Sequence, residues 1–158
     1  MKLCASEKIA TNLQGENKVT ERKGHCLCGA VHYRISAEPV AARICWCRDC
    51  QYIAANGTIN ILVPTSALEI DGELSERIGT ADSGNKIMRR FCPSCGSHLF
   101  ANSSARPQFT VVRAGTLDGP SSIQPTANIW ASSAPAWACL SSDLERVEQQ
   151  PSPPPASR

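Results

Sequence analysis

Cysteine spacing is the feature that most restricts what this chain can fold into. The 158-residue sequence contains nine cysteines, and seven of them fall in three tight clusters. An odd number of cysteines is unfavourable for a disulfide framework, whereas clustered cysteines are typical of metal ligands or catalytic groups. The clusters are Cys26-Leu27-Cys28, Cys45-Trp46-Cys47-Arg48-Asp49-Cys50 and Cys92-Pro93-Ser94-Cys95, and Cys4 and Cys139 lie apart from them.

The sequence favours a reducing compartment, in which clustered thiols stay available for metal. Residues 1–20 are polar and lack the apolar stretch of roughly 7–15 residues that a signal peptide needs. No other run approaches the ~18 apolar residues of a membrane-spanning helix. We therefore expect a cytoplasmic protein without a membrane partner.

The balance of charges argues against nucleic acid and anionic membranes as partners. Sixteen Lys and Arg residues face fourteen Asp and Glu residues, for a net charge of +2, and no basic block is present. Such a balance provides no electrostatic attraction for the phosphates of nucleic acid or for an anionic membrane surface. We expect a small-molecule substrate and no nucleic acid, and the sequence leaves the oligomeric state open.

Short β-type segments separated by turn signals predict an all-β domain. Turn sequences such as Asp71-Gly72 and Ser83-Gly84-Asn85 lie between segments rich in β-branched and aromatic residues. The predicted strands are 31–35, 58–63, 67–70, 76–79, 86–91, 109–114 and 127–131.

Two short helical segments are predicted within this β pattern. Residues 48–55 would form a short helix directly after the middle cysteine cluster. Residues 141–146 would form a second turn, with Ser142 as the cap and Glu145 three residues later, as in a capping box.

Composition divides the chain into three parts. Residues 1–21 form a polar extension, residues 22–147 form the domain, and residues 148–158 are a Pro-rich segment that we expect to be disordered. A β domain of this size with only eight aromatic residues has a small core, so bound metal would be a useful supplement to its stability.

The first and third clusters together predict a closed zinc site. A C-x-x-C turn such as Cys92 to Cys95 supplies half of a tetrahedral site. Cys26 and Cys28 point to the same face of a strand, and the flanking glycines permit the bend that brings their sulfurs together. Four thiolates leave no open position, so this site would be structural, joining the first strand to a hairpin far along the chain.

The middle cluster predicts an open, catalytic zinc site. The three thiolates of Cys45, Cys47 and Cys50 leave a fourth position for water or a substrate atom, unless His25, His98 or Cys139 occupies it. With three thiolates the site carries a net charge of −1, so its bound water would be a weaker acid than water at a three-histidine site. An incoming thiol suits such a site better than a zinc-bound hydroxide does.

Two residues near the middle cluster are candidates for binding a substrate or cofactor. Arg48 could neutralise the anionic site or receive a carboxylate, or it could be an exposed loop residue. Asn56 could donate a hydrogen bond to a bound carbonyl, or it could end the helix in a left-handed conformation.

Arginines and tryptophans are further candidates for the walls of a site. Strand alternation sends Arg89 and Arg90 to opposite faces, so one of them could border a pocket. Trp46, Trp130 and Trp137 could wall a cleft or could serve as core packing.

The order of these motifs resembles the glutathione-dependent formaldehyde-activating enzyme family, also called centromere protein V/Gfa-like. The resemblance extends over roughly residues 22–147. The matching runs are Gly24-His25-Cys26-Leu27-Cys28-Gly29-Ala30-Val31, Cys45-Trp46-Cys47-Arg48-Asp49-Cys50, Phe91-Cys92-Pro93-Ser94-Cys95-Gly96-Ser97-His98-Leu99, Ile129-Trp130 and Ala134-Pro135-Ala136-Trp137.

The resemblance implies a fold, two metal sites and an activity. The implied fold is all-β of the β-tent type, with small zinc-stapled antiparallel sheets and a short helix after the middle cluster. The implied activity is that of a carbon–sulfur lyase that adds glutathione to an aldehyde such as formaldehyde or reverses that addition. Trp46 stands where the family often has His, and Ala136 is inserted before Trp137. The implied ligands are Cys26, Cys28, Cys92 and Cys95 for a structural zinc and Cys45, Cys47 and Cys50 for a catalytic zinc.

Three functional hypotheses follow from these observations. We favour a zinc-dependent carbon–sulfur lyase that acts on adducts of glutathione, or of a similar thiol, with aldehydes or other electrophiles. A second hypothesis is a glutathione-independent zinc Lewis acid that catalyses decarboxylation, elimination or cyclisation in small-molecule biosynthesis. A third is a non-catalytic, zinc-stapled interaction module, which a basic low-complexity extension would support, and neither end of the chain supplies one.

Overall fold

The chain folds into two β-sheets and one short α-helix, as the computed structural model shows for residues 20–151. The helix α1 spans Arg48–Ala54, and no helix in the described range is long and apolar enough to cross a membrane. The strands are β1 Arg22–His25, β2 His32–Ile35, β3 Ala41–Cys45, β4 Thr58–Pro64, β5 Leu68–Asp71, β6 Ser75–Thr80, β7 Lys86–Phe91, β8 His98–Ser103, β9 Phe109–Arg113, β10 Ala127–Ile129 and β11 Glu145–Val147.

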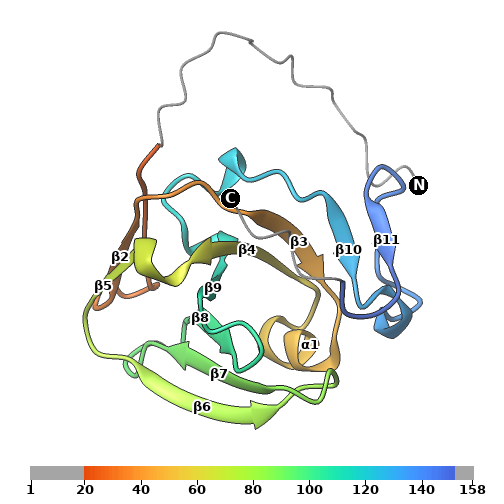
Figure 1. Cartoon of the computed structure of the whole chain (residues 1–158), viewed down its shortest axis with the longest axis horizontal. Coiled ribbons are helices and arrows are strands. Elements are labelled where there is room, and N and C mark those ends of the chain that lie inside the picture. The colour runs from red at the N-terminus through yellow and green to blue at the C-terminus, as the bar shows by residue number, and fades with distance from the viewer. Residues whose placement is uncertain (1–19, 152–158) are drawn as a thin grey trace, which may run out of the picture.

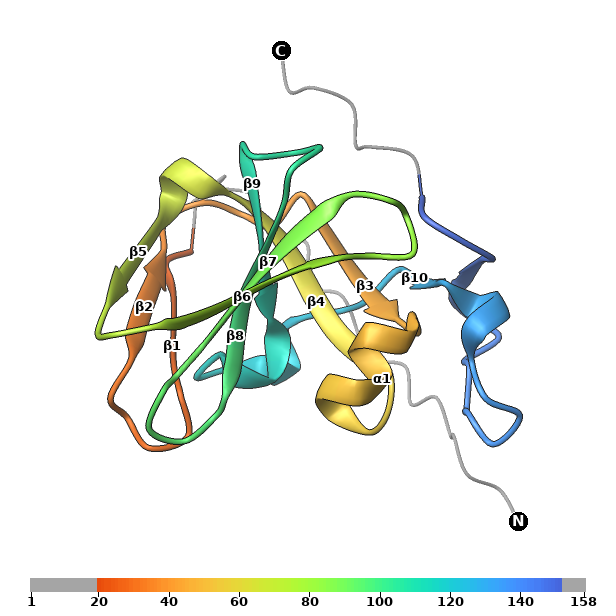
Figure 2. The same cartoon turned by 90° about the horizontal axis from the view of Figure 1, so that it is seen from below.

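The larger sheet is strongly curved. Its strand order is β11-β10-β3-β4-β9-β8-β7-β6, and the smaller sheet has the order β1-β2-β5. In Figure 1, β3 and β4 lie above, β6 and β7 lie below, and β8 and β9 lie between them. Seen from below in Figure 2, β6 and β7 cross in front of β4. The predicted all-β class is confirmed, and the curvature of the large sheet creates an inner face.

Strand pairing departs in one place from the antiparallel pattern expected from the sequence. β10 pairs in parallel with both β3 and β11, whereas the other pairs are antiparallel. Parallel neighbours need a long crossover between them, and residues 130–144 provide it between β10 and β11.

The hydrophobic core lies between the two sheets, and β4 separates the core from the inner face of the large sheet. Ile61 and Val63 are fully buried in the core with Tyr33 of β2. Because side chains alternate along a strand, Asn60 and Leu62 project from the opposite face of β4. The core side of β4 therefore stabilises the fold, and its other side is available to form a site.

One predicted helical segment is confirmed, and the other forms a turn at residues 142–143 but no helix. α1 follows the middle cluster as predicted and ends at Ala55, which has a left-handed conformation with a φ of 54°. Residues 141–146 form no helix: Ser141 Oγ accepts the Asp143 N–H, and the chain then enters β11. Pairing with β10 satisfies the backbone groups of this segment, and it outweighs the weak local preference for a capped turn.

Hydrogen bonding continues past β11 into the segment predicted to be disordered. The Glu148 carbonyl accepts the Ser132 N–H and hydroxyl, and the Gln149 carbonyl accepts the Trp130 N–H. Residues 148–150 therefore lie beside residues 130–132, which follow β10. The rest of the predicted tail, 152–158, and residues 1–19 of the predicted extension lie outside the described residues.

Gly24 provides a test of how the small sheet joins the core. It pairs with Tyr33 in β2 and forms an isolated bridge with Leu117, and a Cβ atom at this position would overlap the Tyr33 hydroxyl and the Thr116 carbonyl oxygen. We expect Gly24→Ala to lower the free energy of unfolding by about 1–3 kcal/mol, the usual cost of overpacking. Chemical denaturation of the metal-loaded protein measures this change.

Gly119→Ala is the matched control for that variant. A Cβ atom at Gly119 has no neighbour within 4 Å, and neither glycine has a positive φ. Its free energy of unfolding should change by less than about 0.5 kcal/mol, as for surface substitutions in general. Equal effects of the two substitutions would contradict the close approach at Gly24.

Candidate active site

Four cysteine sulfurs from two distant parts of the chain meet beside the small sheet. Cys26 and Cys28 follow β1, and Cys92 and Cys95 lie between β7 and β8. All four sulfurs lie within 4.8 Å of one another; the Cys26–Cys28 distance is 3.5 Å and the Cys28–Cys92 distance is 3.8 Å. Thiolates on a tetrahedral zinc, with Zn–S bonds of about 2.3 Å, lie about 3.8 Å apart. The donor set and spacing therefore suit a closed metal site.

Tight turns shape the backbone around this four-cysteine cluster, and Cys26 and Cys28 lie in such a turn after β1 rather than on the strand that the sequence predicted. Gly29 and Gly96 have φ values of 77° and 73°, and their N–H groups donate to the carbonyls of Cys26 and Cys92 at 3.0 and 2.9 Å. The Val31 N–H donates to Cys26 Sγ at 3.3 Å. A metal held here would link β1 of the small sheet to the β7–β8 hairpin of the large sheet.

A second cluster of three thiols lies where β3 meets α1. Cys45 ends β3, Cys47 caps α1, and Cys50 lies in the first turn of the helix, with their sulfurs within 4.8 Å of one another. No fourth His, Cys, Asp or Glu from residues 20–151 joins this group. His25, His98 and Cys139, which could have closed the site, all lie elsewhere.

The electrostatics of the three-cysteine cluster favour a bound cation. Hydrogen bonds from the Cys45 and Cys47 thiols, together with the charge of Arg113, hold the pKa of Cys50 far below its usual range. Hydrogen bonding with Cys47 and Cys50, together with burial, raises the pKa of Cys45. One thiolate thus forms readily, but three adjacent thiolates repel one another unless a positive ion compensates for their charge. The chemistry of the donor set is compatible with zinc.

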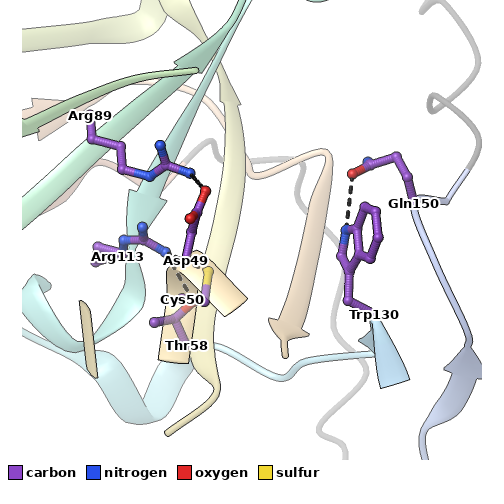
Figure 3. Close-up of polar contacts among 7 residues, drawn as sticks. All are labelled: Asp49, Cys50, Thr58, Arg89, Arg113, Trp130 and Gln150. Atoms are coloured by element: carbon purple, nitrogen blue, oxygen red, sulfur yellow. Dashed lines mark hydrogen bonds and ion pairs between the residues drawn. The ribbon is translucent and has the colours of Figure 1, made fainter. Parts of the chain in front are cut away.

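Arg113 connects the three-cysteine cluster to the large sheet. This buried arginine ends β9; its Nη1 donates to Thr58 Oγ1 at 2.9 Å and lies 3.7 Å from Cys50 Sγ (Figure 3). The same Nη1 also donates to Asn60 Oδ1 at 2.6 Å. Asn60 is the cross-strand partner of Arg113. Sequence reasoning missed Arg113, because its only local signal is its position at the end of a strand.

A second arginine links the helix to the far side of the curved sheet. Arg89 of β7 forms an ion pair with Asp49 of α1, and Figure 3 shows the two side chains pointing toward each other. Its neighbour Arg90 points the other way, over the Phe100 ring and toward Asn102 Oδ1. Of the two arginines singled out from the sequence, Arg89 is therefore the one that borders the inner face.

The inner face of the large sheet forms a pocket of about 160 Å³, and the three cysteines of the second cluster line it. Four arginines line this pocket, and the only carboxylate among its lining residues is the exposed Asp82. The pocket therefore presents an excess of positive charge near the thiols. Its arginines are Arg43, Arg89, Arg106 and Arg113.

Trp130 and Gln150 form the opposite wall of the pocket. The Trp130 indole N–H donates to Gln150 Oε1 at 3.3 Å, and both residues line the pocket (Figure 3). Trp130 has a φ of 57°, which is a strained conformation for a bulky residue and occurs most often near functional sites.

The other two tryptophans do not line this pocket. Trp46 is buried, and its indole N–H donates to Asn128 Oδ1 at 3.1 Å. A Cβ atom at Gly57 would lie 2.8 Å from its ring, so Trp46 packs closely against the backbone. Trp137 is 67% exposed.

The two residues predicted to bind a substrate or cofactor do not line the pocket either. Arg48 is exposed; it donates to Gln51 Oε1 and lies over the Tyr52 ring at 5.0 Å. Asn56 is exposed, and its Oδ1 accepts the Gly57 N–H at 2.8 Å. The structure brings neither side chain to the three-cysteine cluster.

Two comparisons with known proteins found a similarity, one to a family and one to a solved structure. The family model described as "Glutathione-dependent formaldehyde-activating enzyme" matches residues 21–133. A crystal structure of a Rhodobacter sphaeroides protein, determined in a structural genomics programme, is similar in fold, with a TM-score of 0.51 and 25% sequence identity. The similarity covers 65% of this chain and 91% of that protein. No curated protein sequence matches the chain.

Metal content provides a direct test of the two clusters. We expect two metal ions per wild-type chain and one in either Cys28→Ala or Cys47→Ala, measured by elemental analysis of purified protein. Loss of the metal at Cys28 should also lower the midpoint of unfolding, because that ion joins two sheets. Loss of the metal at Cys47 should leave the midpoint closer to that of the wild type.

Cys139→Ala is the control for both variants, because Cys139 lies outside the two clusters. It should retain both ions. A stoichiometry of two in Cys47→Ala would contradict a metal site at the three-cysteine cluster.

Proposed function

This chain belongs to the glutathione-dependent formaldehyde-activating enzyme family, and we propose that it is a zinc-dependent carbon–sulfur lyase that acts on glutathione adducts of aldehydes. The observation that carries the proposal is that all three thiols of the second cluster line the cationic pocket. A metal held by three protein ligands at a pocket has room for a substrate atom, which is the arrangement of a reactive site.

Cys45, Cys47 and Cys50 would hold the reactive zinc, and the four-cysteine cluster would hold a structural one. When bound at the pocket, zinc supplies Lewis acidity, which lowers the pKa of an incoming thiol and polarises a carbonyl oxygen. Two of the three thiols are buried, and Cys47 is half-buried. The cluster is therefore held rigidly, and its environment strengthens electrostatic interactions.

Arg113 would position Cys50 and offset part of the negative charge of the three thiolates. Its Nη1 is held by Thr58 and Asn60, so the guanidinium cannot turn away from the sulfur without breaking two hydrogen bonds. A fixed cation at this point makes the site more receptive to an incoming thiolate, because it lowers the repulsion between that thiolate and the cluster.

The proposed reaction forms one carbon–sulfur bond. The thiol loses its proton, its sulfur attacks the aldehyde carbon, and the carbonyl π electrons move to oxygen, which takes up a proton to give an S-hydroxyalkyl adduct. Protons and electrons balance without a further reagent. In the reverse direction the carbon–sulfur bond breaks, and the thiolate and the aldehyde separate.

The activity test compares Cys47→Ala with Cys139→Ala. Exchange NMR of formaldehyde and glutathione, with and without enzyme, measures the acceleration over the spontaneous addition. Loss of a residue that supports a metal ligand typically lowers activity by about 10–100-fold. Removal of the metal ligand Cys47 itself should therefore lower the rate acceleration by at least about 100-fold. Cys139→Ala should keep wild-type acceleration, and unchanged turnover in Cys47→Ala would overturn the proposal.

Arg113→Lys tests the positioning role of the guanidinium. Lysine keeps the charge but cannot reproduce the fixed, branched geometry of the guanidinium. We expect kcat to fall by about 10–100-fold with both metals retained. Arg34→Lys, which changes an exposed arginine paired with Glu69 on the small sheet, is the control. Wild-type kcat in Arg113→Lys would contradict this role.

Omitting thiol separates the lyase from a glutathione-independent Lewis acid. The excess of arginines in the pocket suits any anionic small molecule, and this observation favours the Lewis acid as the second candidate. Turnover of an electrophile without added thiol would support that alternative, whereas strict dependence on thiol supports the lyase.

A further inference from the structure

We propose that an apolar row on the inner face of the large sheet binds an apolar substituent of the electrophile, so that the substrate is an aldehyde larger than formaldehyde. This row, the apolar floor, consists of Ala41 of β3, Leu62 of β4, Val111 of β9 and Ala101 of β8. The inference deepens the proposed function, and it rests on it for the pocket being the site of reaction.

The strand register places the four residues of the apolar floor side by side. Ala41 pairs with Leu62, and Leu62 pairs with Val111. Val111 in turn pairs with Ala101. Directly paired residues project to the same face of a sheet, so the four side chains form one continuous row across four strands. All four residues line the pocket that contains the three-cysteine cluster.

The apolar floor is separate from the hydrophobic core. Its residues belong to neither of the hydrophobic clusters formed within residues 20–151. Leu62 and Val111 are half-buried, whereas their strand neighbours Val63 and Val112 are fully buried on the opposite face. Apolar groups that line a concave surface lose their contact with water when an apolar ligand occupies it. The large sheet therefore presents a second apolar surface, which faces the pocket.

The apolar floor lies at a distance from the three-cysteine cluster. On β9, Arg113 lies beside Cys50, and Val111 lies two residues earlier, about 7 Å along the strand. On β3, Ala41 lies four residues before Cys45 and on the same face, about 14 Å along the strand. A reactant that is held at the cysteines reaches the floor only if several atoms follow its reacting atom.

The pocket has room for such a reactant. A cavity needs about 10–15 Å³ to admit one water molecule, and this pocket measures about 160 Å³. Formaldehyde, which is little larger than water, would leave most of this space to solvent. An apolar chain would instead displace water from the floor, with a gain in affinity of about fourfold for each buried methylene group.

Two further apolar side chains line the pocket beside the three-cysteine cluster. Ile129 of β10 pairs with Cys45 and projects into the pocket, and Trp130, the next residue, lines it as well. Consecutive side chains of a regular strand project to opposite faces, and the left-handed backbone of Trp130, with a φ of 57°, breaks this alternation. A carbon chain attached to the reacting carbon therefore meets apolar groups near the cluster as well as on the floor.

The arginines of the pocket lie around the apolar floor. Arg43 and Arg113 lie in the neighbouring row, and Arg106 lies in the turn between β8 and β9. Arg89 ends the floor row, where Asp49 pairs with it. Glutathione is polar along its length and charged at both ends, so its groups would lose hydration on the floor without gaining partners. The apolar substituent therefore belongs to the other reactant, the electrophile.

The first experiment compares propanal with hexanal, which have the same reactive group and differ by three methylene groups. Exchange NMR with glutathione measures the enzymatic acceleration of each addition in the metal-loaded wild type. We expect kcat/KM for hexanal to exceed that for propanal by at least about tenfold, because the additional methylene groups leave water. Equal or lower kcat/KM for hexanal would overturn the inference.

Two substitutions test the apolar floor by opposite means. Val111→Thr keeps the shape of the side chain but introduces a hydroxyl group, and Ala41→Leu fills the space above the floor. Each should lower the ratio of kcat/KM for hexanal to that for propanal by about fivefold or more. Ile78→Thr, which changes an exposed side chain of β6 outside the pocket, should leave the ratio unchanged. A wild-type ratio in both floor variants would contradict the role of the floor.

Unreactive amides separate this inference from the proposed function. Saturation-transfer NMR measures the Kd of acetamide and of hexanamide for the metal-loaded protein in the absence of thiol. Tighter binding of hexanamide that Val111→Thr weakens supports the apolar floor, even if the enzyme fails to act on glutathione adducts. Equal Kd values for the two amides overturn the floor, even if the enzyme turns over glutathione and formaldehyde.

A last comparison tests whether the apolar group belongs to the electrophile or to the thiol. 1-Hexanethiol replaces glutathione, with formaldehyde as the electrophile, in the wild type and in Val111→Thr. A preference for hexanal that depends on Val111, without one for hexanethiol over glutathione, supports the electrophile. A preference for hexanethiol that depends on Val111, without one for hexanal, assigns the apolar group to the thiol and overturns the inference.

Discussion

Repulsion between clustered thiolates is the constraint on which the rest of this structure depends. Seven thiols lie in two groups whose sulfurs are within 4.8 Å of one another, and such groups can ionise together only beside a compensating cation. The four-cysteine cluster is suited to compensation by a metal alone, and it joins the small sheet to the β7–β8 hairpin. At the three-cysteine cluster, the protein adds Arg113 as a fixed positive charge beside Cys50. One cluster therefore suits a structural role, and the other faces a pocket and suits a reactive role.

The curvature of the large sheet creates the pocket around the three-cysteine cluster. Because β6 and β7 fold over the inner face, Arg89 of β7 meets Asp49 of α1 although forty residues separate them in the chain. The same curvature brings arginines from three strands and one turn into a single cavity. Protein groups engage Arg89 and Arg113, whereas within residues 20–151 neither Arg43 nor Arg106 forms an ion pair or a side-chain hydrogen bond.

The C-terminal part of the fold completes the pocket from outside the region that matches the family model. That match ends at residue 133, whereas β11 pairs with β10, and residues 148–150 then lie beside residues 130–132 and bring Gln150 against Trp130. The strained backbone of Trp130 is held by hydrogen bonds on both sides, because its N–H donates to Gln149 and its carbonyl accepts from Ser133. The pocket is therefore lined both by residues inside the matched region and by Gln150 beyond it.

Local spacing in the sequence was enough to predict the all-β class, the strand 86–91, the helix after Cys47 and the division of the cysteines into groups of four and three. These features depend on neighbouring residues, because i, i+2 and i, i+3 spacing determines which thiols can converge. The strands β1, β3, β8 and β11 escaped prediction, as did the position of Arg113 beside Cys50. Their roles arise from cross-strand register and sheet curvature, which depend on residues far apart in the chain. Long-range pairing also decided the end of the segment 141–146, because pairing with β10 replaced its local helical preference. The sequence by itself thus determined which groups could bind metal, and the tertiary structure decided which of them face a substrate, because only folding sets what surrounds each group.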